Sequence, residues 1–188
     1  PEDFAVDTSW DEVYDSLQLS MTNPAAEAFE FESQKGPSET LQEHLLWQLE
    51  LTQFSDRDRI IAMSIIDSIN ADGYLISSLE DIFQGLQAQM EDLEFDEVIA
   101  VLHNVQNFDP SGVGAIDLQD CLRLQLLQLS ESTPYRKEAL DLVINCLDLL
   151  ANQDQVKLLK KLELNEQVLS KTIALVRSLD PKPGAKIQ

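Results

Sequence analysis

The sequence has few glycines and prolines, six and seven among 188 residues. Such numbers fit a chain with few, tight connections and argue against a β-protein, which needs many turns. No segment alternates apolar and polar residues convincingly, so no strand is predicted. Leu, Gln, Glu, Asp and Ala dominate instead, and as a group they favour helix. The composition therefore predicts an all-α fold.

Cysteine and histidine are also scarce, with two of each. Cys121 and Cys146 stand in leucine-rich helical patterns without a CxxC motif, which predicts buried, reduced thiols and a cytoplasmic protein. Neither His44 nor His103 is preceded three residues earlier by Glu, so the Glu-x-x-His motif of carboxylate-bridged metal bundles is absent. No Walker loop, nucleophile elbow or HExxH motif is present. We expect no cofactor, no metal and no enzymatic activity.

Long apolar runs are missing as well. The most apolar stretch, residues 139–150, is interrupted by Asp141, Asn145 and Asp148, so no segment is expected to span a membrane. No charged-then-apolar signal peptide is present. Because the chain begins at Pro1 rather than Met, we expect either a processed protein or an excised fragment, and we favour the fragment.

Positive charge is the scarcest property, with 13 Lys and Arg against 34 Asp and Glu, a net charge of −21. Residues 1–36 carry nine acids and one Lys, a net of −8, and residues 37–110 carry fifteen acids and two Arg, a net of −13. Residues 111–188 carry ten of each sign. Because negative surfaces repel phosphate backbones, direct nucleic-acid binding by the first 110 residues is not expected. A basic groove on another protein is the natural complement.

Residues 1–36 offer too little apolar surface to form a core, which predicts an acidic, largely extended or disordered linker. One stripe with helical spacing interrupts it, formed by Trp10, Val13, Tyr14 and Leu17. This stripe predicts either a short amphipathic helix near residues 9–19 that docks on a partner or a transient helix in a disordered tail. The candidate partner-binding residues here are Trp10, Asp11, Glu12 and Asp15.

From residue 37 onward, apolar residues repeat at helical spacing. Ser55 and Ser78 are predicted to cap two of the helices, and Thr133 followed by Pro134 is predicted to open another. The eight predicted helices are marked by residues 41–49, 61–69, 79–86, 95–105, 118–126, 140–147, 156–162 and 168–176.

The second half of this region repeats the first. Residues 41–49 and residues 118–126 share the pattern LQ(E/D)xLxxQL, and an Asp-Pro break comes later at Asp109-Pro110 and again at Asp180-Pro181. These matches predict two related helical bundles, residues 37–110 and residues 111–188. The residues expected to form the structural turns are Gly73, Asp109, Pro110, Gly112, Gly114, Asp180, Pro181 and Gly184.

Lys157, Lys160 and Lys161 form a small basic face on a short predicted helix. They are candidate contacts for an acidic patch or a phosphate, and the alternative is an ordinary solvated face.

Four longer strings closely resemble the core-binding region of the bacterial sigma-54 factors, the enhancer-dependent class of sigma factor. They occur in the order of that family and read TLQEHLLWQL at 40–49, DSINADGYL at 67–75, VQNFDPSGVGA at 105–115 and LDPKPG at 179–184. The resemblance covers about residues 37–188, and residues 1–36 resemble the variable acidic linker of the family in composition. One departure is Ile116, where the family pattern leads us to expect a basic residue.

The resemblance implies a fragment that binds core RNA polymerase through its large subunits, with the acidic segment lying in a basic channel of the polymerase. A full-length factor of this family also involves promoter DNA and an ATP-dependent activator. The activator-responsive and promoter-reading regions of the family are not in this chain, so direct DNA binding by the fragment is not expected. The alternative, suggested by charge alone, is an acidic helical adaptor or DNA-mimic protein that binds a basic partner.

Overall fold

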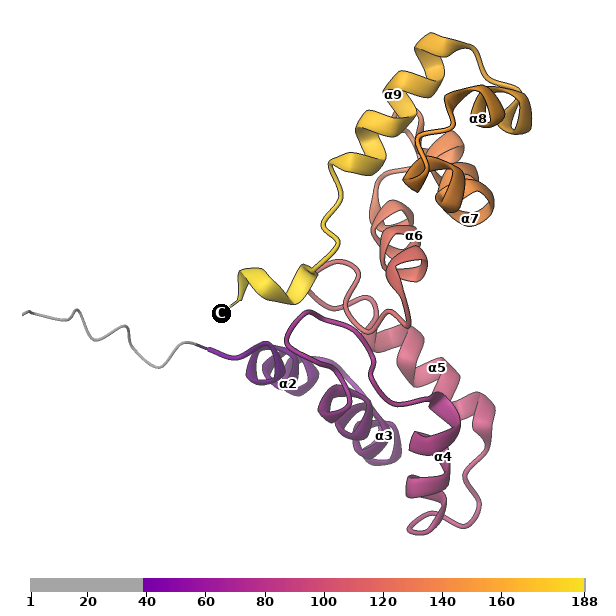
Figure 1. Cartoon of the computed structure of the whole chain (residues 1–188). Helices are drawn as coiled ribbons and strands as arrows, with labels where there is room; N and C mark the ends of the chain where they lie inside the picture. Colours follow the sequence, from indigo (N-terminus) through magenta and orange to yellow (C-terminus); the bar gives the residue numbers. More distant parts are fainter. Residues whose placement is uncertain (1–38, 188) are drawn as a thin grey trace, which may run out of the picture. The chain divides into compact units, whose positions relative to one another are not determined.

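The computed structural model describes residues 39–187 (Figure 1). This part of the chain contains eight α-helices and a short 3-10 helix and has no strand, so the all-α prediction is confirmed for it. The acidic segment 1–36 and the Trp10 stripe lie outside the described residues. The helices are α2 (Leu41–Leu51), α3 (Asp56–Asp67), α4 (Leu79–Gln87), α5 (Phe95–Val105), α6 (Leu118–Gln128), α7 (Arg136–Ala151), α8 (Gln155–Leu162), α9 (Glu166–Arg177) and the 3-10 helix η1 (Pro183–Lys186).

Most of these helices begin at a polar side chain that accepts a hydrogen bond from a free backbone N–H of the first turn. Thr40 caps α2 in a complete capping box with Glu43. Ser55 caps α3 by accepting from the N–H of Asp58, and Ser78 caps α4 in the same way. The two predicted serine caps are therefore confirmed.

The predicted start of α7 at Thr133 is wrong. The helix begins at Arg136, and the residue before it, Tyr135, has a left-handed φ of 65°. The Arg136 guanidinium explains the later start, because it donates to the carbonyl oxygens of Leu126 at 2.8 Å and Leu127 at 3.1 Å. Arg136 thus holds the first turn of α7 against the end of α6, and this contact between two helices overrides the local Thr-Pro signal.

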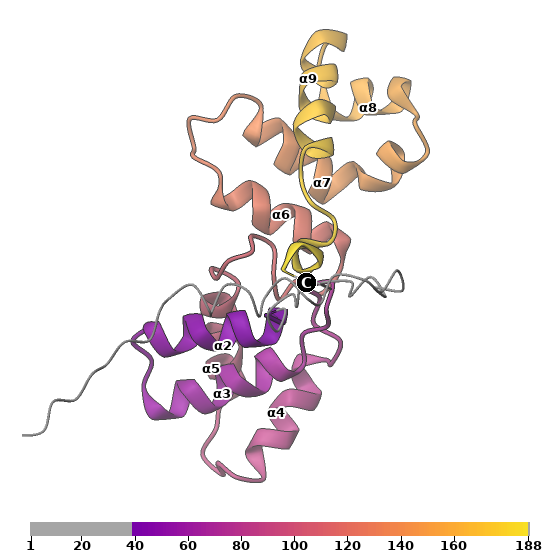
Figure 2. The same ribbon diagram turned by 90° about the vertical axis from the view of Figure 1, so that its left-hand side faces the viewer.

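Helices α2 to α5, which we call the first bundle, lie next to one another in Figure 2. They share one apolar core. Most of its fully buried side chains lie on the predicted apolar faces, and burying each Leu or Ile contributes roughly 1.5–3 kcal/mol. Ile69 lies beyond the end of α3 but is still buried. The largest fully buried members are Leu45, Leu49, Ile61, Ile65, Ile66, Ile69, Val98, Val105 and Val113.

Helices α6 to α9, the second bundle, enclose a separate apolar core around Leu126, Leu142 and Leu158. Helix α7 is kinked at Cys146, whose φ is −137°. The Lys161 ammonium donates to the carbonyl oxygen of Asn145 at 2.7 Å, directly before the kink. A polar contact from α8 therefore satisfies a carbonyl group beside the irregular turn.

The two bundles use equivalent side chains for equivalent hydrogen bonds. In α2, the Gln42 amide donates to the Asp67 and Ile69 carbonyl oxygens, at 3.4 and 3.3 Å. At the matching position of α6, the Gln119 amide donates to the Val143 and Ile144 carbonyl oxygens, at 3.0 and 2.6 Å. The repeat predicted from sequence is therefore present in three dimensions as a four-helix unit used twice.

After α9 the chain returns to the first bundle (Figure 1). The Gly184 N–H donates to the Asp72 carbonyl oxygen at 3.1 Å, and the Lys182 ammonium lies 3.1 Å from the Asp72 carboxylate. Ile187 packs against the first apolar core. A Cβ atom on Gly184 would stand 2.3 Å from the Ala71 carbonyl oxygen, so only glycine permits this approach of two backbones.

We predict that Gly184→Ala lowers the free energy of unfolding by about 1–3 kcal/mol, because the added methyl group meets backbone that cannot move aside freely. The matched control is Gly85→Ala in α4, where an added Cβ meets nothing within 4 Å. That control should raise stability by about 0.5–1 kcal/mol, since alanine restricts the unfolded chain. Urea denaturation measures both, and equal effects of the two substitutions would contradict the prediction.

Candidate functional site

The turn between α3 and α4 meets the connection between the two bundles. The Asn70 side chain accepts from the Tyr74 N–H at 2.9 Å, and Gly73 completes the turn with a φ of 99°. The Gly114 N–H donates to the Gly73 carbonyl oxygen at 2.8 Å. The Leu75 N–H donates to the Ala115 carbonyl oxygen at 2.9 Å. These backbone bonds place the connection alongside the turn and fix its path.

Each bundle also ties its Asp-Pro break to its first helix through one glutamine. The Gln48 amide donates to the Asp109 carbonyl oxygen at 2.6 Å and accepts from the Asp109 N–H at 2.8 Å. Gln125 makes the same two bonds with Asp180, at 2.6 and 2.8 Å. We call each pair of bonds a glutamine clasp. The Asp109–Pro110 peptide bond is cis.

The clasp of the second bundle is the more enclosed of the two. Gln125 is 7% exposed, and Gln48 is only partly buried. A further buried amide, Gln106, donates to the Gly114 carbonyl oxygen at 3.0 Å, and its own backbone carbonyl oxygen accepts from Gln128 at 3.0 Å. Glutamine side chains thus satisfy the backbone at the junction, where no helix supplies partners.

The glutamines were missed by the sequence prediction, which named the Asp-Pro and glycine positions as turns. The signal that could have identified them is the repeat itself, because Gln48 and Gln125 occupy the same place in LQ(E/D)xLxxQL. Ile116, the departure from the family pattern, is largely exposed. An isoleucine in place of the expected basic residue therefore does not disturb the packing of the core.

The titratable groups at the junction have pKa values and hydrogen bonds that fit a structural role rather than a catalytic one. Burial raises the pKa of the Cys121 thiol, which keeps it in the protonated, poorly nucleophilic form. Burial also raises the pKa of Tyr74 to about 12, and its hydroxyl group donates to the Pro181 carbonyl oxygen. A hydrogen bond from Lys186 holds the pKa of Asp180 below its usual range.

The surface of the first bundle is acidic and has little internal compensation. Arg57 lies 2.8 Å from Glu97 and 3.0 Å from Asp92, and Arg59 lies 2.8 Å from Glu50. Both arginines of residues 37–110 are therefore engaged within the bundle, and most of its fifteen acids remain available to a basic partner.

The three predicted lysines of α8 have different surroundings. Lys157 lies 2.8 Å from the carboxylate of Asp154, the residue that caps the helix, and Lys161 donates to a carbonyl of α7. Lys160 makes no ion pair within residues 39–187. The pKa of Lys157 is raised by its hydrogen bond with Asp154. Lys161 thus joins α8 to α7, whereas the exposed Lys157 pairs with the N-cap residue of its own helix.

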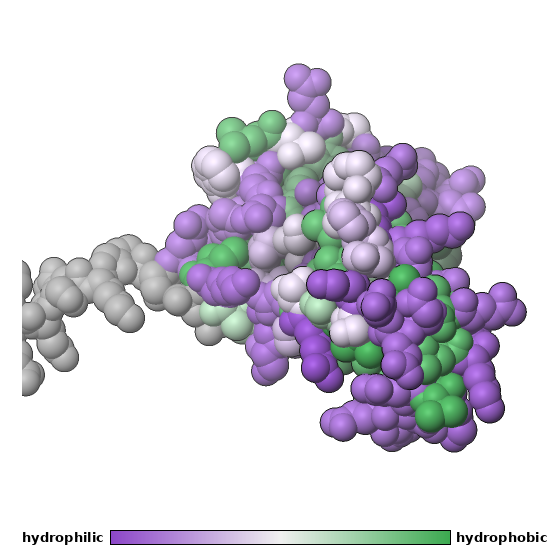
Figure 3. Space-filling model, turned by 90° about the horizontal axis from the view of Figure 1, so that it is seen from above, coloured by the Kyte–Doolittle hydropathy of each residue, from purple (hydrophilic) through white to green (hydrophobic). Residues whose placement is uncertain are grey.

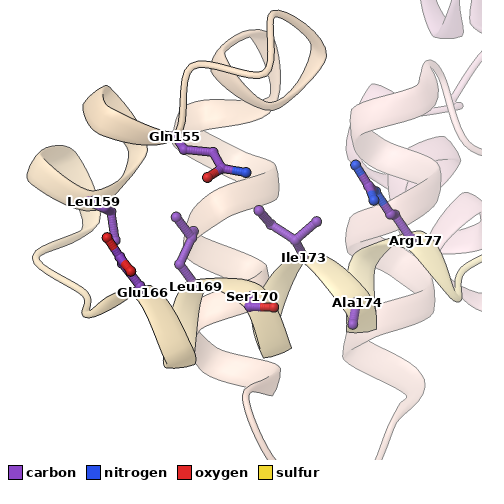
Figure 4. A pocket seen from close by; sticks show the side chains of 8 residues that line it. All are labelled: Gln155, Leu159, Glu166, Leu169, Ser170, Ile173, Ala174 and Arg177. Atoms are coloured by element: carbon purple, nitrogen blue, oxygen red, sulfur yellow. The ribbon is translucent and has the colours of Figure 1, made fainter.

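A groove of about 540 Å³ runs between α8 and α9 (Figure 4). Its middle is apolar and includes Leu159, Leu169 and Ile173. Glu166 and Arg177 lie at opposite ends of its α9 wall. Figure 3, which looks down from above Figure 1, shows hydrophobic patches among hydrophilic side chains on the face toward the viewer.

No group of three or more His, Cys, Asp or Glu within residues 39–187 is arranged to hold a metal ion. None of the helices in that region is long and apolar enough to cross a membrane. The described residues offer a junction built from backbone and amide contacts, an acidic first bundle with a hollow of about 570 Å³ beside α2 and the turn after α3, and a second bundle with the groove between α8 and α9. This set is suited to binding another macromolecule.

Comparison with known proteins shows the family to which the chain belongs. Residues 30–188 match the family model described as "Sigma-54 factor, core binding domain". The chain belongs to the sigma-54 factor family. Sigma-54 factors are transcription initiation factors, so the expectation that the protein is not an enzyme agrees with the family.

The relatives match along the whole chain. The RNA polymerase sigma-54 factor of Pseudomonas putida is 44% identical over 188 residues, and that of Azotobacter vinelandii is 43% identical over the same length. The Escherichia coli K12 sigma-54 factor is 44% identical over 189 residues. The match covers 100% of this chain but only 37–39% of these three relatives. The chain therefore spans about two fifths of the length of a sigma-54 factor.

We predict that Gln125→Ala lowers the free energy of unfolding by about 1–3 kcal/mol, because the partly buried N–H group of Asp180 loses its partner and its C=O group keeps only the weak Cys121 Sγ donor at 3.7 Å. Gln48→Ala should cost less, about 0.5–1.5 kcal/mol, since water can reach the groups that it frees. The control is Gln167→Ala at an exposed position of α9, with an expected change within about 0.5 kcal/mol. Chemical denaturation gives the order, and a larger loss for Gln48→Ala would contradict it.

Proposed function

We propose that this chain is the part of a sigma-54 factor that holds core RNA polymerase, through the large polymerase subunits. The match to the core binding domain over residues 30–188 carries the proposal. In this proposal residues 1–36 are an acidic linker, residues 37–110 form the first domain and residues 111–188 form the second. We place the protein in the cytoplasm, where the polymerase is.

The geometry supports a binding role in two ways. The clasps and the Gly184 contact fix the backbone of the junction, so surfaces of both bundles can be presented with little loss of conformational entropy. The acidic first bundle, with its two arginines already paired, favours encounter with a basic surface. Direct binding to DNA is not proposed for this chain, because its negative charge repels phosphates. Promoter DNA and an ATP-dependent activator are proposed partners of the whole factor.

We further propose that the acidic linker lies in a basic, nucleic-acid-accepting channel of the polymerase. The support is its net charge of −8 together with the apolar stripe at Trp10. Trp10, Asp11, Glu12 and Asp15 would make the contacts there, and Lys157, Lys160 and Lys161 remain candidates for a contact with an acidic patch.

The chain is expected to comigrate with purified core polymerase on a sizing column at micromolar concentration and low salt. An unrelated acidic helical protein of similar net charge is the control, and it should elute separately. Failure of the chain to comigrate would reject the proposal. Comigration of both proteins would instead favour the alternative of a DNA-mimic or general acidic adaptor.

Neutralising Asp11, Glu12 and Asp15 together should weaken polymerase binding more at low salt than at high salt, because salt screens exposed charges. The control removes the same three charges from exposed positions of the first bundle as Glu91→Gln, Glu94→Gln and Asp96→Asn, and its effect should be smaller. Affinity measured at two salt concentrations tests this. Equal losses at both concentrations would rule out a charge contact by the linker.

A further inference from the structure

The groove between α8 and α9 has a counterpart in the first bundle, because α4 and α5 are the repeat equivalents of α8 and α9. The two N-caps fix the register: Ser78 corresponds to Asp154, and Glu94 corresponds to Asn165. Counting from these caps, Phe83 is equivalent to Leu159.

By the same count, Phe95 is equivalent to Glu166. In the first bundle these two phenylalanines meet edge to face, with ring centroids 5.6 Å apart and an interplanar angle of 88°. Phe83 also packs against the buried residues of the first core. The first bundle therefore closes the space between its last two helices with an aromatic pair.

The second bundle leaves the same space open. A leucine and a glutamate replace the aromatic pair, and a groove of about 540 Å³ remains, with Leu169 and Ile173 along its α9 wall (Figure 4). Aromatic side chains therefore fill the space between α4 and α5 in the first bundle, and none from residues 39–187 fills the equivalent space between α8 and α9 in the second.

The ends of the groove carry opposite charges. Glu166 and Arg177 are eleven residues apart on α9, which corresponds to about 16 Å, or three helical turns. Neither residue forms an ion pair within residues 39–187. A three-turn segment with a cation at one end and a carboxylate at the other would pair with both.

We propose that this groove receives an amphipathic helical segment of core RNA polymerase. The segment would place an aromatic or large aliphatic side chain between Leu159 and Ile173, a basic residue near Glu166 and an acidic residue near Arg177. Such packing of an apolar helix face into a groove is a common mode of peptide recognition. The inference rests on the proposed function and names a surface that the polymerase contacts.

Two other occupants fit less well. A second copy of the chain would bring two net charges of −21 together, which opposes self-association. An acidic segment that binds only the α8 lysines would not reach the groove. Gln155 and Leu159 line the groove from one face of α8, and the three lysines lie on a different face of that helix.

The main test fills the groove as the first bundle does, with the double variant Leu159→Phe and Glu166→Phe in the 188-residue chain. We expect at least a tenfold loss of affinity for purified core polymerase and no loss of thermal stability, since the added rings occupy empty space. The control is Lys171→Phe, which adds a ring at an exposed position of α9 that does not line the groove but lines the neighbouring hollow beyond Glu166 and Ser170. It should change the affinity less than twofold.

A charge test does not depend on filling the groove. Arg177→Glu should weaken polymerase binding at least fivefold, whereas Lys171→Glu, with the same charge change on the same helix, should weaken it less than twofold. If the double variant loses stability, the comparison of Arg177→Glu with Lys171→Glu alone decides whether the groove contacts the polymerase.

The outcomes separate the two proposals. If the unmodified chain does not bind polymerase, the proposed function fails. If it binds, and the filled-groove and Arg177→Glu variants bind as well as their controls, the groove assignment is overturned and the proposed function stands. A concentration-dependent dimer that the double variant abolishes would overturn the assignment in favour of a second copy.

Discussion

The structure depends most on the two-way bond between the Gln125 amide and the backbone of Asp180. A primary amide is suited to this role because it donates and accepts at once, so a single side chain satisfies both polar groups of one residue. Without it, the partly buried N–H group of Asp180 would be unpaired, and its carbonyl oxygen would keep only the weak bond from the Cys121 thiol. Together with the Tyr74 bond to Pro181 and the Lys182 pair with Asp72, this bond directs the Pro-Lys-Pro-Gly segment toward the contact of Gly184 with Ala71 and Asp72.

The first bundle has the same bond, from Gln48 to Asp109, and the second bundle begins just beyond it. A glutamine clasp thus ties the end of each four-helix unit to the first helix of that unit and fixes where the chain leaves it. On this common framework the two copies have diverged in opposite ways. The first is acidic on its surface and closed by an aromatic pair between α4 and α5, whereas the second is neutral overall and open between α8 and α9.

The helices could be predicted because their determinants are local. Apolar residues at helical spacing marked all eight, and the Ser55 and Ser78 caps set two of the starts. The start of α7 could not be predicted, since it depends on Arg136 reaching the carbonyl groups of α6, a contact that no local pattern encodes.

The candidate site was less accessible to sequence reasoning. The Asp-Pro positions are visible because proline is conspicuous, but the glutamines that hold them look like ordinary polar positions of a helix. The groove was invisible for a related reason. Leu159 and Glu166 become informative only when the equivalent helices are compared in three dimensions and the missing aromatic pair is seen. The partner-binding residues predicted in the linker lie outside the described residues and stay predictions.

The contact between Gly184 and the Ala71–Gly73 turn joins parts of the chain that are more than one hundred residues apart. Contacts of such long range form late, because the entropy of closing the intervening loop must be overcome first. On the ribosome, the first bundle is synthesised before every residue of the second, yet its turn is covered only after α9 and η1 have emerged. The first bundle is therefore complete only when the last residues of the second bundle pack on its turn. Although the first bundle is synthesised first, it is not completed first.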